Sequence, residues 1–178
     1  MGSQEPAPLS LTEWTVLGLI AEQPRHGFAV ARELAPNGPL GRIWTVRRPL
    51  VYRAVDRLRG DGLVEPTRTE PGDQGPDRTV LRVTRRGRDR LRRWLREPVA
   101  HPRDVRTELL VKLALLARAD ATLVPLARDQ LDAFAPAFEA LARRRATDPA
   151  ERIVELWRFE SSQAVMRLLE TLIADVTT

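Results

Sequence analysis

Side chains that commonly perform catalysis are scarce in this chain of 178 residues. It has no cysteine and only two histidines, His26 and His101. Without cysteine there is no thiolate nucleophile, disulfide, iron–sulfur cluster or cysteine-bound zinc, and two histidines far apart in sequence leave little for a metal site or a catalytic triad. The carboxylates are scattered along predicted helices, and no pair of them stands alone in an apolar setting. We therefore predict that the protein is not an enzyme and holds neither a metal nor a cofactor.

Arginine is the abundant charged side chain, and its placement is uneven. Of the 29 basic residues only Lys112 is a lysine. Residues 1–97 carry 18 arginines against 12 acidic residues, a net charge of +6, whereas residues 98–178 have a net charge of −1. An arginine-rich composition often reflects a coding bias, so the location of the charge says more than the count. A basic segment joined to a neutral one fits a protein that binds a polyanion through its first half; the alternative is a generally arginine-rich surface.

Apolar spacing and turn residues predict the elements that position these arginines. Apolar residues at helical spacing predict helices over 11–22 and 28–34, and we expect His26 to start the second helix or to pack against it. Residues 43–46 form a short segment with β propensity. A third helix should begin near Pro49, because proline suits the first helical position.

A hairpin signature follows the third helix. Strands are predicted over 63–69 and 78–84, on either side of a segment at 70–77 that is dense in turn-forming residues and should protrude as a loop. Thr84 is a suitable N-cap for a helix over 85–97. Three helices followed by two strands is the order of a winged helix-turn-helix.

The second half of the chain is helical in pattern throughout. Apolar residues recur three and four positions apart in three segments, which favours antiparallel helices packed at a shallow angle. Pro136 lies inside the second of these segments and should kink or divide it. We predict a mostly α fold, with a winged helix-turn-helix domain at 9–97 and an all-helical dimerisation domain at 103–178. Dimerisation is expected because the apolar stripe from Ile153 to Val176 is too long for the first domain to cover.

The third helix is the element best suited to bind DNA. A major groove admits one α-helix, and this helix has an arginine-rich N-terminus whose dipole also favours phosphate. Arg57 adds a further charge to the same short element. Arg68 and Arg78 flank the loop of the hairpin and could hold phosphates of the neighbouring backbone.

Several segments of the chain also resemble a known family, the PadR-like transcriptional regulators. The resemblance is strongest over 14–97 and is carried by the order and spacing of short motifs. These are Leu-Gly-Leu-Ile at 17–20, His-Gly-Phe at 26–28, Leu-Val-Tyr-Arg-Ala-Val-Asp-Arg-Leu at 50–58, Asp-Gly-Leu-Val at 61–64, Val-Thr-Arg-Arg-Gly at 83–87 and Glu-Leu-Leu-Val-Lys-Leu at 108–113.

The resemblance implies a homodimeric repressor that binds a near-palindromic DNA operator and is released by a small molecule. Carried over by position, it implies that Arg47, Arg48, Tyr52 and Arg53 face DNA. The family usually has serine and glycine just before this helix, where the present chain has Arg47, Arg48 and Pro49. The details of base reading therefore need not carry over, whereas phosphate binding is strengthened.

Some assignments remain open on the sequence alone. Tyr52 is either a phosphate contact or a tyrosine at the edge of the core. Trp94 and Trp157 are weak candidates for binding a flat aromatic effector, and packing in the core or at a subunit interface is the favoured explanation of both. A winged-helix adaptor that binds protein instead of DNA is the alternative function, but it would not need several arginines on the third helix.

The location of the protein is predicted from what its segments lack. No apolar run approaches the 18 residues of a membrane span, and the first residues have neither a basic nor an apolar signal region. The sequence therefore predicts a cytoplasmic protein with no membrane partner.

Overall fold

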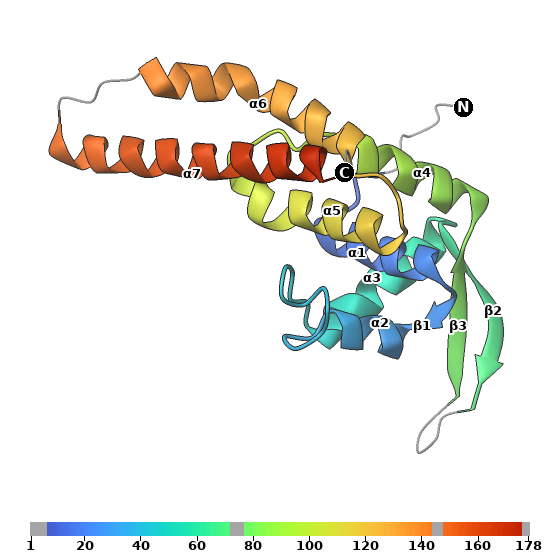
Figure 1. The fold of residues 1–178 in the computed structure, drawn as a ribbon. Coiled ribbons are helices and arrows are strands. Elements are labelled where there is room, and N and C mark those ends of the chain that lie inside the picture. The colour runs from blue at the N-terminus through green and yellow to red at the C-terminus, as the bar shows by residue number, and fades with distance from the viewer. Residues whose placement is uncertain (1–6, 72–76, 144–147, 176–178) are drawn as a thin grey trace, which may run out of the picture. The chain divides into compact units, whose positions relative to one another are not determined.

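The computed structural model describes residues 7–71, 77–143 and 148–175, and the chain divides into two compact units, Met1–Leu95 and Arg96–Thr178. Figure 1 labels their elements along the chain. The described part of the first unit contains helices and one three-stranded sheet, and that of the second contains only helices. The predicted mostly helical fold, with a wing in its first half, is confirmed.

The first unit follows the predicted order of helices and strands. Its elements are α1 (Leu11–Glu22), β1 (Arg25–His26), α2 (Gly27–Glu33), α3 (Arg48–Gly60), β2 (Val64–Glu70), β3 (Arg78–Val83) and α4 (Arg85–Arg96). The predicted loop at 70–77 falls largely on residues 72–76, which lie outside the described residues.

Polar side chains begin three of these helices. Ser10 caps α1 through a capping box, in which its hydroxyl accepts from the Glu13 backbone N–H while the Glu13 carboxylate accepts from the Ser10 N–H. His26 caps α2, because its Nδ1 accepts from the Ala29 N–H at 3.0 Å. Thr84 precedes α4 and accepts from the Gly87 N–H at 3.0 Å. The roles predicted for His26 and Thr84 are confirmed.

Helix α3 ends just before Gly62, which has a left-handed backbone conformation. Gly62 has φ +66°, the Gly62 N–H donates to the Arg59 carbonyl, and the Leu63 N–H donates to the Leu58 carbonyl. These two bonds form a Schellman motif, which satisfies carbonyls that the helix end would leave unpaired. The motif turns the chain sharply into β2.

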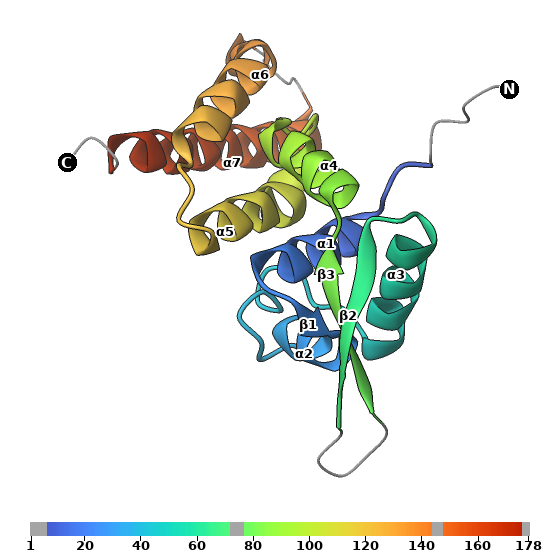
Figure 2. The same cartoon turned by 90° about the vertical axis from the view of Figure 1, so that its right-hand side faces the viewer.

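The sheet has the order β1-β3-β2 and is antiparallel throughout. Figure 2 shows the β2–β3 hairpin extending beyond α2 and α3. The short strand β1 was not predicted; its Arg25 pairs with Leu81 of β3. Conversely, the β-prone segment 43–46 is not a strand, because the Ile43 and Trp44 N–H groups both donate to the Leu40 carbonyl in a turn.

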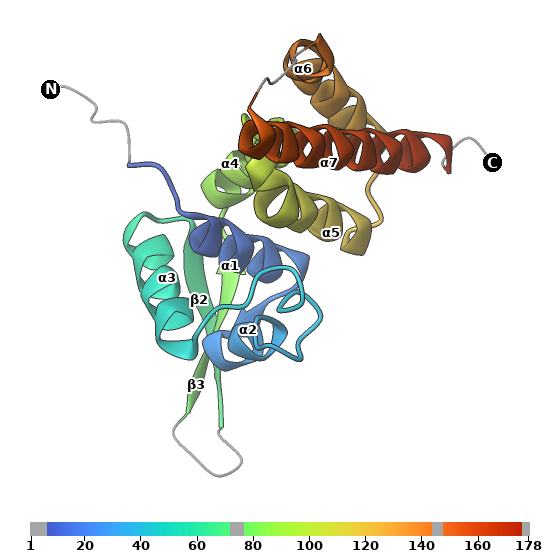
Figure 3. The same cartoon turned by 90° about the vertical axis from the view of Figure 1, so that its left-hand side faces the viewer.

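Apolar side chains from α1, α2, α3 and the strands form the core of the first unit. Val16, Leu17, Val30, Val51 and Leu58 have no exposed surface, and Figure 3 shows α1, α2 and α3 grouped together.

Helix α4 joins this core through tryptophan. Trp94 stacks on Trp14 of α1 with ring centroids 5.0 Å apart and planes 7° from parallel. A stacked aromatic pair buries a large apolar area and contributes beyond that area. The pair therefore fixes α4 to α1 within the first unit.

The second unit is built from one irregular entry and three longer helices. Its elements are η1 (Pro102–Asp104), a turn of 3₁₀ helix, η2 (Val105–Leu109), a π-helical segment, α5 (Leu110–Arg118), α6 (Val124–Arg143) and α7 (Pro149–Ala174). Helix α6 continues through Pro136 as one helix, so the proline does not divide it. Leu109, Ala127, Phe134 and Leu169 are among the residues of one buried cluster.

Two buried polar groups organise the beginning of this unit. The Gln130 amide pairs with both backbone groups of Val99, accepting from its N–H at 2.7 Å and donating to its carbonyl at 3.0 Å. Lys112 is 1% exposed, and its ammonium donates to the Glu97 carbonyl at 2.7 Å and pairs with the Glu108 carboxylate at 2.8 Å. Glu108 and Lys112 lie four residues apart, and their ion pair is buried on the lysine side.

Helix α7 leaves much of its apolar surface uncovered. Only Ser162 and Leu169 are buried among its described side chains, whereas Ile153, Leu156 and Trp157 are 71%, 60% and 67% exposed. Over the part of the chain that the structure describes, no helix combines the length and the apolar character that crossing a membrane requires.

Candidate nucleic-acid interface

Helix α3 separates an apolar face from a basic one. Val51, Ala54, Val55 and Leu58 are buried, and this spacing of three and four residues puts them on one side of the helix. Arg47, Arg48 and Arg53 are exposed. Arg47 is the N-cap residue, and no side chain caps this helix end. The positive end of the helix dipole therefore coincides with two exposed arginines.

The ring of Phe28, in α2, brings α3 and the wing together. The Arg48 guanidinium carbon lies 5.0 Å from the centre of this ring, and that of Arg78, at the start of β3, lies 4.9 Å from it. Both distances are within the range of cation–π attraction. Arg48 and Arg78, predicted from separate elements, are thus held against one aromatic side chain.

Tyr52 belongs to the same group. Its hydroxyl accepts from Arg48 at 3.4 Å, and the Arg48 guanidinium carbon lies 5.6 Å from the Tyr52 ring centre. A Cβ at Gly27 would lie 3.1 Å from Tyr52 Cε1, so the absence of a side chain at Gly27 lets α2 approach this ring. Tyr52 is 38% exposed, which leaves part of it available to a partner.

The charge of this group is positive and uncompensated. Among residues 7–71, 77–143 and 148–175, neither Arg48 nor Arg78 forms an ion pair with a carboxylate. Two guanidinium groups near one ring repel each other, and an anion placed between their donors would relieve that repulsion. We name this set of Phe28, Arg48, Tyr52 and Arg78 the Phe28 cluster. Its chemistry suits a phosphate group.

Arg68 lies on the wing but its charge is shared. Its Nη2 is 2.8 Å from Glu70 Oε1 on the same strand, and its side chain is 60% exposed. An ion pair this exposed is weak, so Arg68 could exchange Glu70 for a phosphate.

Arg57 does not join the exposed arginines. Its guanidinium pairs with Glu13 of α1 and with Asp61, and it donates to two backbone carbonyls. Its donors are directed toward α1, the segment before α1 and the end of α3.

The two candidate tryptophans have different surroundings. Trp94 is 5% exposed and stacked on Trp14, so packing accounts for it. Trp157 is exposed on α7. Over the described residues, no group of His, Asp and Glu side chains is arranged to hold a metal ion.

Phe28 is the site residue that the sequence did not single out. In the sequence it is one apolar residue of a short predicted helix. Its partners come from positions 20 and 50 residues further along the chain, and local spacing carries no signal for such a contact. An aromatic residue next to His26 and Gly27, in a motif of the family, is the only hint available.

The sequence of the first unit decides the family. Residues 16–93, which extend from α1 into α4, match the transcriptional regulator PadR-like family. The first unit belongs to this family. The resemblance is confirmed for the motifs within these residues, and the family is one of transcriptional regulators and not of enzymes.

Solved PadR structures are similar to the chain at low identity. Bacillus subtilis PadR in complex with operator DNA is 18% identical, with 93% of this chain and 99% of that chain covered and a TM-score of 0.49. The same protein with p-coumaric acid is 17% identical, with 95% and 100% covered and a TM-score of 0.44. Streptococcus mutans smu.1604c is 14% identical, with 91% and 98% covered and a TM-score of 0.43. No curated protein matches the chain. The assignment to the PadR-like family therefore depends on the sequence match.

Proposed function

We propose that this PadR-like regulator is a homodimeric repressor that binds a near-palindromic DNA operator through α3 and the wing. The observation that carries the proposal is the Phe28 cluster, in which Arg48 of α3 and Arg78 of β3 share one ring. Among the described residues neither cation has a carboxylate partner, and a phosphodiester backbone supplies the missing negative charge.

The proposed contacts divide between the groove and the backbone. Arg47 is exposed at the start of α3, which is the part of a recognition helix that reaches base edges. Arg48 and Arg53, exposed on the same helix, are proposed to contact phosphates beside the groove. Tyr52, Arg68 and Arg78 are proposed to contact phosphates and so to fix the position of the domain on the duplex. The net charge of +6 over residues 1–97 adds a general attraction to DNA.

The dimer is proposed from α7. Ile153, Leu156 and Trp157 expose large apolar side chains on one helix, and contiguous apolar patches of this kind usually mark a protein interface. A second copy of the chain offers a matching patch, because two-fold symmetry brings the same surface of each subunit together. Two copies of α3 would then read half-sites about one helical turn of DNA apart. Such a protein acts where the DNA is, and we place it in the cytoplasm.

A small aromatic effector completes the proposal. Of the two candidate tryptophans, Trp157 is the one that its own chain leaves uncovered, since it is 67% exposed while Trp94 is 5% exposed, and the proposed dimer puts it at the subunit interface. A flat ring could stack on the Trp157 indole, and we propose that such a ligand relieves repression.

Fluorescence anisotropy over a salt series tests the DNA-binding proposal. The probe is a labelled 30-base-pair duplex that the protein itself selects from a random-sequence pool, and the control is an unselected duplex of the same length. We expect preferential binding to the selected duplex, with an affinity that falls steeply as salt rises because counterions are released from phosphates. If the protein selects no duplex, or binds with no dependence on salt, the adaptor function takes the place of the repressor.

A further inference from the structure

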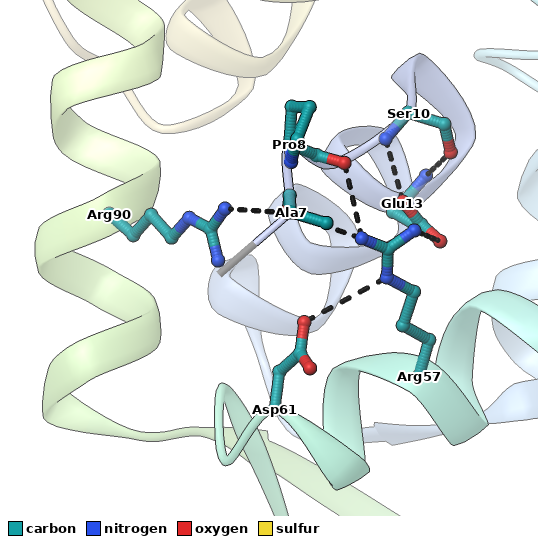
Figure 4. Close-up of polar contacts among 7 residues, drawn as sticks. All are labelled: Ala7, Pro8, Ser10, Glu13, Arg57, Asp61 and Arg90. Atoms are coloured by element: carbon teal, nitrogen blue, oxygen red, sulfur yellow. Dashed lines mark hydrogen bonds and ion pairs between the residues drawn. The ribbon is translucent and has the colours of Figure 1, made fainter. Parts of the chain in front are cut away.

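Among the described residues, Arg57 is the arginine of α3 with the most polar contacts, to two carboxylates and two backbone carbonyls. Its Nη1 lies 3.2 Å from Glu13 Oε1, and its Nε lies 3.8 Å from Asp61 Oδ2. Its Nη2 donates to the carbonyls of Ala7 and Pro8 at 3.2 and 3.1 Å. Figure 4 shows these contacts converging on one guanidinium. Arg57 therefore joins α3 to α1 and to the segment that precedes α1.

Glu13 is a fixed anchor for this arginine. It is 8% exposed, and its second carboxylate oxygen, Oε2, accepts from the Ser10 N–H at 2.6 Å within the capping box of α1. The helix that carries Glu13 thus orients its carboxylate. The ion pair between Arg57 and Glu13 therefore fixes the position of α3 relative to the start of α1.

Arg90 of α4 also contacts the segment that precedes α1. It donates from Nη2 to the Ala7 carbonyl at 3.3 Å, and its guanidinium carbon lies 5.6 Å from the ring centre of Trp14. The Ala7 carbonyl accepts from both Arg57 and Arg90, as Figure 4 shows. The backbone before α1 is therefore held between α3 and α4 by two cations.

We infer that Arg57 is a positioning residue for DNA recognition, which sets the placement of α3 through Glu13, Asp61 and the Ala7–Pro8 carbonyls instead of contacting DNA. The inference rests on the proposed function. Apolar burial along α3 is not directional, whereas charge-assisted hydrogen bonds have defined lengths and angles. Arg57 thereby limits the rotation and sliding of α3, and these would displace Arg47, Arg48 and Arg53 from the DNA.

Arg57→Gln separates a positioning role from a phosphate contact. With the selected duplex, we expect this variant to bind about 3- to 10-fold more weakly at every salt concentration, with the slope of log affinity against log salt unchanged. The matched control is Arg53→Gln on the exposed face of the same helix, which should lower the slope by about 0.9 because one phosphate contact is lost. A slope that also falls by about 0.9 in Arg57→Gln would show a direct phosphate contact and overturn the inference.

Glu13→Gln provides an independent test from the other partner. Glutamine keeps the capping box but removes the charge that holds Arg57, and residue 13 is too buried to touch DNA. We expect the same loss of affinity and the same unchanged slope. The double variant should bind no more weakly than Arg57→Gln alone, since the Glu13 change removes an interaction that Arg57→Gln has already removed.

Thermal melting accompanies each binding measurement. Wild-type affinity in Glu13→Gln overturns the positioning role. So does unfolding of both variants at the assay temperature, because Arg57 would then support the fold and not the placement of one helix. Failure of the proposed function looks different, since the wild-type protein itself would then show no salt-dependent binding to the selected duplex.

Discussion

At the scale of single residues, the molecule distinguishes arginines that face outward from an arginine that contacts other segments of the same unit. Arg48 and Arg78 meet at Phe28 without a carboxylate partner among the described residues, whereas Arg57 has two acidic partners and two carbonyls. These side chains carry the same charge, and only their surroundings separate the proposed nucleic-acid contacts from the proposed positioning residue.

Removing the outward arginines should weaken DNA binding without weakening the protein. We expect Arg48→Ala and Arg53→Ala each to reduce affinity for the selected duplex and to lower the salt slope by about 1, because each loses a contact to DNA. The melting temperature should stay near that of the wild type, since both side chains are exposed. Anisotropy and thermal melting measure the two effects.

The control for this pair is Arg93→Ala, an exposed arginine of α4. It removes the same charge away from α3 and should leave the salt slope close to the wild-type value. A large drop in melting temperature for Arg48→Ala or Arg53→Ala would mean that the arginine serves the fold.

The sequence alone could predict the exposed arginines, but not the contact of Arg48 and Arg78 with the ring of Phe28. The position of Arg47, Arg48 and Arg53 follows from the helical spacing of the buried residues of α3. The role of Phe28 depends on a meeting of α2, α3 and β3 in space. The different role of Arg57 likewise depends on Glu13, which lies on another helix.

At the scale of elements, helix ends were predictable where one residue type decides them. Thr84, His26 and Gly62 are chemically suited to begin or end helices, and each does so. Strand β1 was missed because two residues are too short for any periodicity. Residues 43–46 have β propensity but form no strand, because a turn at Leu40 overrides that propensity.

The end of α3 offers a matched pair of substitutions. Gly62→Ala should lower the free energy of unfolding by about 1–2 kcal/mol, because φ +66° is unfavourable for any residue with a Cβ. Gly60→Ala, in the last turn of the same helix, should be neutral or stabilising, by up to about 1 kcal/mol. Neither Cβ would meet an atom within 4 Å, so conformation alone separates them. Urea denaturation measures both, and equal effects would contradict this account.

At the scale of the whole molecule, each unit has its own core, but the second exposes an apolar helix. Two features of the sequence predicted that its halves differ in structure. The charge is divided unevenly between them, and a pattern of helices and strands gives way to a purely helical one. The number of exposed apolar residues on α7 could not be predicted. The apolar pattern in the sequence is the same whether α5 and α6 or another chain covers the helix.

Trp157→Glu should convert a dimer to a monomer. A charge at the centre of an apolar interface is costly to bury, so light scattering should report a mass near the 20.1 kDa of one chain at micromolar concentration, against twice that mass for the wild type. Trp157→Phe keeps an aromatic side chain and should remain dimeric. A monomeric wild-type protein would contradict the proposed dimer.

The burial of Lys112 has a chemical consequence. It is the only lysine of the chain, and its ammonium is enclosed with the Glu97 carbonyl and the Glu108 carboxylate. A reagent that acylates lysine side chains can reach it only when the helices of the second unit separate locally. The rate of acylation at this one position therefore measures the rate of local opening of that unit. The measurement needs neither a reporter dye nor an engineered residue.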